Sequence, residues 1–266
     1  MYALLRLIMK TYRKYHFHVW KTLVVNFKLL PFKQAIHLPI VIYGKTQLII
    51  SNSSVKLLCS PRFGIVKFAK NHEYFYPTPA PSLLFMINGT MVLEGDVQFS
   101  SGCTLRINDG ILQLGENVCF SGGCKILCNN RIFIRAYSQF AFDCVCCDTN
   151  FHYILQKDGL VKDCVGIIEV GNRNWIGNST TLMRGTQLPD NTIVASRSFV
   201  NKSFLGYHDD GILIAGSPGK VVRLGDQRVF SAQKEMEIRA FFKRGDIKKS
   251  KMTEMWLAES DFFFYE

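Results

Sequence analysis

Acidic residues are absent from the first 72 positions of the chain, which carry twelve lysines and arginines. The remaining positions hold 20 basic and 21 acidic residues, so the net charge of +11 is concentrated at the front. A long uncharged apolar run is also missing there, because charged residues interrupt residues 1–28 every few positions, which excludes a membrane-spanning helix. No uncharged stretch leads to a small-residue cleavage site, which excludes a signal peptide. We therefore expect a cytoplasmic protein.

The basic front, residues 1–35, is predicted to be an amphipathic helical segment. Charged residues lie on one face of this helix, and apolar and aromatic residues lie on the other. Two interpretations stay open: residues 1–30 contact an anionic inner membrane surface peripherally, or the helix packs on its own domain or on a partner. No nucleic-acid motif accompanies the charge, so we expect no nucleic acid partner. The charged face holds Arg6, Lys10, Arg13 and Lys21, and the apolar face holds Leu4, Ile8, Tyr12, Tyr15, Val19 and Leu23.

The paired ligand sets of a metal site are absent too. Cys144, Cys146 and Cys147 form a Cys-x-Cys-Cys run that lacks the second ligand pair zinc normally needs, so we expect no metal. Three of the nine cysteines, Cys103, Cys124 and Cys144, recur about one coil apart. Such spacing is typical of small core residues in a reducing compartment rather than of disulfides.

Residues 170–200 repeat with a period of six. A small polar residue stands four places after each apolar one, which fits neither a helix nor an ordinary strand and favours a triangular solenoid. Each coil of a solenoid buries its apolar edge only against its neighbours. The apolar positions are Val170, Ile176, Leu182, Leu188, Val194 and Val200, and the small polar ones are Asn174, Thr180, Thr186, Thr192 and Ser198.

The same register continues toward the N-terminus with short excursions. Residues 40–50, 55–58 and 83–91 are apolar and less regular, and we interpret them as the first coils. We therefore expect an all-β solenoid over residues 36–224 and a helical tail over residues 225–266, in which a helix over residues 230–243 covers the last coil. The columns that carry the register are Leu93, Leu114 and Ile134, followed by Phe99, Phe120 and Phe140.

The register is lost between Cys146 and Ile168, which predicts an extruded loop over residues 147–167. Loops that leave a rigid scaffold often carry function. Among the six histidines, His152 alone lies in such a loop with regular coils on both sides. Histidine is suited to accept a proton near neutral pH, so His152 is a candidate general base. The alternative is a loop histidine without chemistry.

The hexads, the sequence Asn174-Trp175-Ile176-Gly177, the ending Gly216-Ser217-Pro218-Gly219-Lys220 and His152 together resemble the hexapeptide-repeat acyltransferases. The likeness is specific over residues 140–224 and strongest to the sugar and polysaccharide O-acetyltransferase branch. It implies a left-handed parallel β-helix, here with an N-terminal amphipathic helix and a C-terminal helix. It also implies acetyl-CoA as co-substrate, a sugar or glycan acceptor, and a homotrimer with active sites between subunits.

The resemblance also implies roles for individual residues. His152 aligns with the base that deprotonates an acceptor hydroxyl. The context that the resemblance suggests is cell-surface polysaccharide or lipopolysaccharide biosynthesis. Asp148, Asn150 and Trp175 are expected at the acceptor side, although Asp148 could equally form a turn and Trp175 could be structural. The positions expected to contact CoA are Ser196, Asn201, Lys202, Lys220 and Arg223. Arg197 departs from the family by standing where glycine is common.

Other functions remain as alternatives. A catalytically silent β-helix scaffold and an N-acetyltransferase acting on an amino sugar both fit the same pattern. A carbonic-anhydrase-like enzyme would need three histidines converging on a metal, and residues 170–200 contain none. A sugar-nucleotide pyrophosphorylase would need a Gly-rich phosphate loop before the solenoid, and residues 1–90 contain none.

Overall fold

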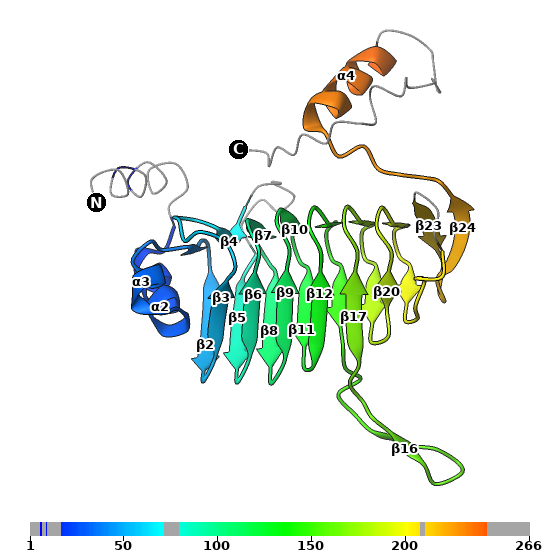
Figure 1. The fold of residues 1–266 in the computed structure, drawn as a ribbon, viewed down its shortest axis with the longest axis horizontal. Helices are drawn as coiled ribbons and strands as arrows, with labels where there is room; N and C mark the ends of the chain where they lie inside the picture. Colours follow the sequence, from blue (N-terminus) through cyan, green and yellow to red (C-terminus); the bar gives the residue numbers. More distant parts are fainter. Residues whose placement is uncertain (1–5, 7–8, 10–16, 72–79, 208–210, 244–266) are drawn as a thin grey trace.

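The computed structural model describes residues 6, 9, 17–71, 80–207 and 211–243. In these ranges the chain winds into a solenoid of three parallel sheets, which we call sheets A, B and C in the order in which the chain first visits them (Figure 1). Most coils contribute one strand to each sheet, and most corners between strands are short. The expected stacked, parallel architecture is therefore confirmed.

The strands pair coil by coil in parallel register up to the last coil. Sheet A contains β1 (Ile40–Ile42), β4 (Val66–Lys70), β7 (Val97–Ser100), β10 (Val118–Phe120), β13 (Gln139–Phe140), β18 (Trp175–Ile176), β21 (Ile193–Val194), β23 (Ile212–Ala215) and β24 (Lys220–Leu224). Sheet B contains β2 (Thr46–Ser51), β5 (Ser82–Ile87), β8 (Thr104–Asn108), β11 (Lys125–Cys128), β14 (Val145–Cys147), β19 (Thr181–Met183) and β22 (Phe199–Val200). Sheet C contains β3 (Ser54–Leu57), β6 (Thr90–Leu93), β9 (Ile111–Leu114), β12 (Arg131–Ile134), β17 (Ile167–Val170) and β20 (Gln187–Leu188).

The core is the stack of inward side chains that the six-residue period predicts. All six apolar hexad positions between Val170 and Val200 are at most 2% exposed. In the earlier coils the rings of Phe99, Phe120 and Phe140 stack, with centroids 4.9 and 4.7 Å apart. Burial of such a continuous apolar column is the main term that stabilises a solenoid.

The small inward residues at the corner between sheets A and B satisfy backbone carbonyls of the next coil. The thiol of Cys103 donates to the Ser121 carbonyl (3.2 Å), and the thiols of Cys124 and Cys144 donate in the same way one and two coils later. Thr180 continues this ladder by donating to the Ala195 carbonyl (3.1 Å). The nine cysteines are free, so the recurring cysteines act as small core donors.

Helices α2 (Val19–Leu29) and α3 (Phe32–Ala35) cover the N-terminal end of the solenoid (Figure 1). The first strand has no neighbouring strand on its outer side, and side chains of α2 form the hydrogen bonds that such a strand would form. The Asn26 side chain donates to the Ile40 carbonyl and accepts from the Ile40 amide, and the Thr22 hydroxyl accepts from the Ile42 amide. Lys21 and Lys28 donate to carbonyls of β2. One face of α2 therefore packs on the solenoid of the same chain and forms hydrogen bonds with the backbone groups of its first strands. Most of the predicted helix before residue 17 lies outside the described residues.

The C-terminal end differs from the expectation. Helix α4 (Ala232–Lys243) lies within the predicted tail, but Figure 1 shows it clear of the last coil. Strand β24 closes the end of sheet A instead, by pairing antiparallel with β23. The antiparallel strand β24 forms hydrogen bonds with the backbone groups at the open edge of β23, so that edge does not need a covering helix.

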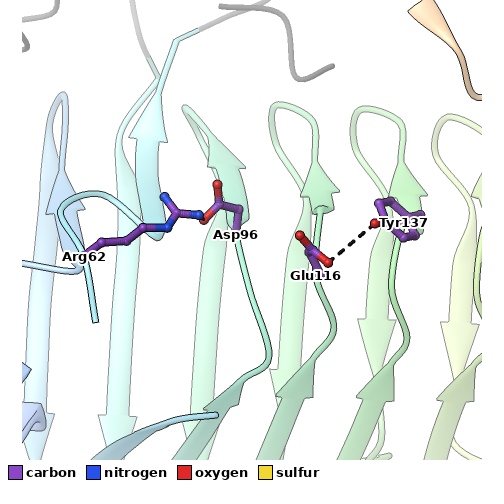
Figure 2. Close-up of polar contacts among 4 residues, drawn as sticks. All are labelled: Arg62, Asp96, Glu116 and Tyr137. Carbon is purple, nitrogen blue, oxygen red and sulfur yellow. Dashed lines mark hydrogen bonds and ion pairs between the residues drawn. The ribbon is translucent and has the colours of Figure 1, made fainter. Parts of the chain in front are cut away.

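The corner between sheets C and A carries a polar row along successive coils, shown in Figure 2. Arg62 forms an ion pair with Asp96, and the hydroxyl of Tyr137 donates to Glu116 at 3.5 Å. These side chains link neighbouring coils at the surface, where single ion pairs contribute at most about 1 kcal/mol. None of them belongs to the site that the sequence predicts.

Candidate functional site

The chain leaves the solenoid at the corner between sheets B and C, between the end of β14 and the start of β17. There it forms a hairpin of β15 (Ile154–Leu155) and β16 (Val161–Lys162), which projects from the coils (Figure 1). This excursion coincides with the predicted break in the hexad register. His152 lies near its base, in the segment just before β15, and its side chain is exposed.

The base of the hairpin is tightly connected to the coils. Thr149 and Val165 form an antiparallel bridge, and the Asn150 amide donates to the Cys164 carbonyl (2.8 Å). The Gly166 amide donates to the Asp148 carbonyl (2.8 Å), so the two ends of the excursion are held together. Because both ends are fixed, the backbone that leads into His152 starts from a defined position.

Asp148 has a different position from the acceptor-binding one expected. Its side chain is fully buried, and its carboxylate accepts hydrogen bonds from the backbone amides of Asn129 (2.7 Å) and Asn130 (2.8 Å) in the preceding coil. Burial raises the pKa of this carboxyl group, although the amide bonds oppose that shift. In the single chain the carboxylate is thus closed to an acceptor and stabilises the corner from which the hairpin leaves. This matches the turn-forming alternative for Asp148.

Trp175 is half-exposed at the start of β18, on sheet A. The guanidinium of Arg228, from the segment after β24, lies over its ring at 5.5 Å and over the ring of Phe230 at 5.1 Å. The hairpin leaves from the corner opposite sheet A, so one chain does not bring Trp175 and His152 onto one face. The contact of Arg228 with Trp175 could not be predicted from the local sequence pattern.

The residues expected to contact CoA are all exposed, and they form two groups on the last coils. Ser196 lies at the corner between sheets A and B, where the Gly219 amide, next to Lys220, donates to the Phe199 carbonyl (2.7 Å). Asn201 and Lys202 follow β22 toward the corner between sheets B and C, the corner that carries the hairpin.

Two further arginines, Arg223 and Arg197, lie on the last coils. Arg223 lies farther along β24 and forms an ion pair with Asp226 (3.0 Å). Arg197 has a φ of +60°, in the left-handed region that glycine adopts without strain. A glycine at this position would adopt that conformation without the strain that a side chain adds.

A groove of about 390 Å³ lies on sheet C, and none of the expected site residues lines it. Its charged lining consists of three carboxylates and one guanidinium, from Glu94, Glu169, Asp190 and Arg135. Such a surface repels the phosphates of a nucleotide, which argues against CoA in this groove. Among the described residues, no group of three or more His, Cys, Asp or Glu is arranged to hold a metal ion.

Sequence reasoning missed Arg106, which the coil stacking brings to the hairpin. Arg106 lies on β8, and its guanidinium is 5.5 Å from the ring centre of Phe151, the residue that precedes His152. It also lies 5.2 Å from the ring centre of Phe85 and donates to the Asn129 side chain (2.8 Å). The signal available was the shared outward register of Phe85 and Arg106 on sheet B.

Comparisons with known proteins give one partial sequence match and several structures of similar fold. No protein-family model matches the chain. A chloramphenicol acetyltransferase from Morganella morganii is 35% identical over 74 residues, which are 27% of this chain and 33% of that relative. The chain therefore matches only about a third of that protein's length.

The superposition with one solved structure, NeuO, supports the fold. The polySia specific acetyltransferase NeuO superimposes with a TM-score of 0.54 at 11% identity, covering 79% of this chain and 85% of NeuO. AntD, an N-acyltransferase from Bacillus cereus, gives a TM-score of 0.43 at 11% identity, covering 77% and 88% of the two chains. The fold shared with NeuO is the left-handed parallel β-helix expected from the sequence.

Proposed function

We propose that this protein is an O-acetyltransferase that moves an acetyl group from acetyl-CoA to a sugar hydroxyl, with His152 as general base. The observation that carries the proposal is the placement of His152 on the hairpin that interrupts an otherwise regular solenoid. The fold shared with NeuO and the segment related to an acetyltransferase support the same chemistry. Polysaccharide or lipopolysaccharide biosynthesis is the proposed context.

In this mechanism the imidazole of His152 takes the proton of the acceptor hydroxyl, whose oxygen attacks the thioester carbonyl carbon. Backbone N–H groups of a neighbouring coil stabilise the oxyanion that forms. The carbon–sulfur bond then breaks, and the imidazolium returns its proton to the leaving thiolate, which gives the acetyl ester and free CoA. A positioned base of this kind contributes roughly 10²- to 10⁴-fold in rate.

The charge distribution supports the proposed CoA side. Lys202 and Lys220 are exposed on the last coils, together with Ser196 and Asn201, and can meet phosphates or the pantetheine amides. Arg223 already has an acidic partner in the chain and must exchange it to contact a phosphate. Asn150 and Trp175 stay in the proposal as acceptor contacts, Trp175 through a neighbouring subunit.

The test is release of CoA thiol from acetyl-CoA with a panel of acceptors: polysialic acid, neutral glycans, free sugars, an amino sugar and chloramphenicol. We expect turnover with a sugar hydroxyl and a loss of roughly 10²-fold or more in kcat for His152→Ala. His18→Ala is the matched control, because His18 is also exposed but lies at the N-terminal end of the solenoid, several coils from the hairpin. Unchanged turnover in His152→Ala would refute the base, and no turnover with any acceptor would favour the silent scaffold.

We propose a homotrimer in which His152 of one subunit faces the coils of the next. The hairpin beyond His152 exposes five large apolar or aromatic side chains: Tyr153, Ile154, Leu155, Leu160 and Val161 are each at least 55% exposed. Apolar surface of this kind on a projecting element marks an interaction site. Light scattering should give the mass of a trimer. The double variant Leu155→Ser with Leu160→Ser should have a lower mass, because it removes apolar side chains from the proposed contact. A monomer that turns over acetyl-CoA would contradict the proposed assembly.

We also propose that the front of the chain contacts an anionic membrane peripherally. No helix within the described ranges is long and apolar enough to cross a membrane. The outer face of α2 and α3 exposes Trp20 (75%), Phe32 (71%) and Phe27, beside Lys33 and within a region that holds no acidic residue. Aromatic rings together with positive charge suit an anionic lipid interface.

Sedimentation with vesicles tests this contact. Binding to vesicles with anionic lipid should exceed binding to neutral vesicles, and Trp20→Ser with Phe32→Ser should reduce it. Val222→Ser with Leu224→Ser is the control, because it removes exposed apolar surface on β24, away from both the N-terminal helices and the hairpin. Equal binding of both double variants would contradict the assigned face.

A further inference from the structure

Arg106 and the hairpin are joined at one point, the ring of Phe151. The guanidinium of Arg106 lies over the ring of Phe85 (5.2 Å to its centre) and over the ring of Phe151 (5.5 Å), and only Phe151 belongs to the hairpin segment. Its Nη1 donates to Oδ1 of Asn129 at 2.8 Å, which fixes the plane of the guanidinium. A planar cation fixed by a hydrogen bond and stacked on two rings is a rigid support.

The backbone at Phe151 is held in an unusual conformation. Its φ is +60°, a left-handed value that a bulky aromatic residue rarely adopts. The Thr149 hydroxyl accepts a hydrogen bond from the Phe151 amide (2.9 Å), which closes the turn from one side. The stack on Arg106 holds the side chain on the other side. The Thr149 hydroxyl and the Arg106 guanidinium therefore hold the turn that leads into His152.

The support for Arg106 is connected to the support for the hairpin base. Asn129, which accepts from Arg106, also donates its backbone amide to the buried carboxylate of Asp148 (2.7 Å). The neighbouring Asn130 side chain donates to the Gly166 carbonyl (3.0 Å) at the far end of the hairpin. Arg106 and the two ends of the hairpin are therefore tied to one corner of one coil.

We propose that Arg106 is a positioning residue for His152: through Phe151 it fixes the turn that presents the imidazole to the acceptor. This inference rests on the proposed role of His152 as base. Arg106 has no direct contact with the reacting atoms in this proposal and acts only by limiting where the imidazole lies. A displacement of about 1 Å in a reacting group can cost roughly 10²-fold in rate.

The first test is Arg106→Lys, which keeps the positive charge and removes the planar group. We expect kcat to fall roughly 10- to 100-fold while KM for acetyl-CoA stays at the wild-type value. Arg62→Lys is the matched control, because Arg62 also pairs with a side chain of another coil but lies at the corner between sheets C and A. An unchanged kcat in Arg106→Lys would overturn the proposal.

The second test separates positioning from a general structural effect. In a His152→Ala background Arg106→Lys should cause no further loss, because the group that it positions is gone. An equal fold loss in both backgrounds would overturn the proposal. A wild-type rate in His152→Ala alone would instead remove the proposed base, so the two failures are distinguishable.

Phe151 gives an independent check if Arg106→Lys folds poorly. Phe151→Tyr keeps the ring over the guanidinium and should keep kcat, whereas Phe151→Leu should lower kcat about as much as Arg106→Lys. Both variants change only the hairpin side of the contact. Equal kcat for the two variants would show that the stack does not act on His152.

Discussion

Replacing Asp148 by asparagine tests whether the corner that carries the hairpin depends on a buried carboxylate. The carboxylate accepts from two backbone amides, at 2.7 and 2.8 Å, and is fully buried. Asparagine can accept only one of these bonds and places its own N–H donors against the other amide. A lost hydrogen bond to a charged group costs about 1.5–3 kcal/mol, and a buried unpaired N–H costs about 1–3 kcal/mol.

These two costs are partly offset, because the variant no longer buries a charge. We therefore expect Asp148→Asn to lower the free energy of unfolding by about 2–4 kcal/mol at pH 7 in a denaturant titration. The control is Asp158→Asn at the exposed hairpin tip, where the carboxylate accepts one bond from the Leu160 amide (3.1 Å). If Asp148→Asn loses no more than Asp158→Asn, the assignment of Asp148 to the corner is wrong.

The pH dependence gives a second test with a definite sign. Burial raises the folded-state pKa of Asp148 above its value in the unfolded chain, so the folded state binds more protons between the two values. The stability from this linkage is fully present below the unfolded pKa and is lost as pH rises through the folded pKa. Asparagine does not titrate, so the wild-type advantage over Asp148→Asn should grow as pH falls from 7 toward about 4. An advantage that shrinks would show that the amide bonds outweigh burial.

Three further predictions address the solenoid. Phe120→Ala should lower the free energy of unfolding by about 3–5 kcal/mol, because its buried ring is stacked on both sides; a loss below about 1 kcal/mol would contradict this. Gly177→Ala places a Cβ 2.6 Å from a backbone nitrogen and should cost about 1–3 kcal/mol in thermal unfolding, whereas Gly206→Ala meets open space and should cost less. A thiol reagent should label Cys59 and Cys119 first, since the other free cysteines are buried; equal labelling of all nine in the native protein would contradict the fold.

The regular part of the fold could be predicted from the sequence because burial in a solenoid follows a fixed period. Every apolar hexad residue from Val170 to Val200 is buried, and the register of Leu93, Leu114 and Ile134 is the observed pairing on sheet C. The irregular first coils were also found by their apolar character. The end of the solenoid was predicted less well, because the sequence does not distinguish a helix that covers an edge from a reversed strand that pairs with it.

The loop that carries His152 could be predicted from the sequence, and its surroundings less well. The break in register located His152, because a local pattern suffices to detect a missing repeat. The surroundings depend on which residues of other coils lie beside the break. Asp148 is near His152 in sequence, yet its carboxylate is directed to the preceding coil. Arg106 is distant in sequence, yet it contacts Phe151 through the parallel stacking of β8, β11 and β14.

The hairpin combines a fixed base with an exposed tip, and His152 lies between them. The base is held by the Thr149–Val165 bridge, the amide bonds to Asp148 and the contact of Phe151 with Arg106. The tip, from Ile154 to Val161, contributes exposed apolar surface and lies beyond these contacts. In the proposed trimer a neighbouring subunit would hold the tip while the chain's own coils hold the base. The position of the imidazole would then be restricted from both sides only in the assembled trimer. We therefore expect kcat to depend on trimer formation even where acetyl-CoA binding does not.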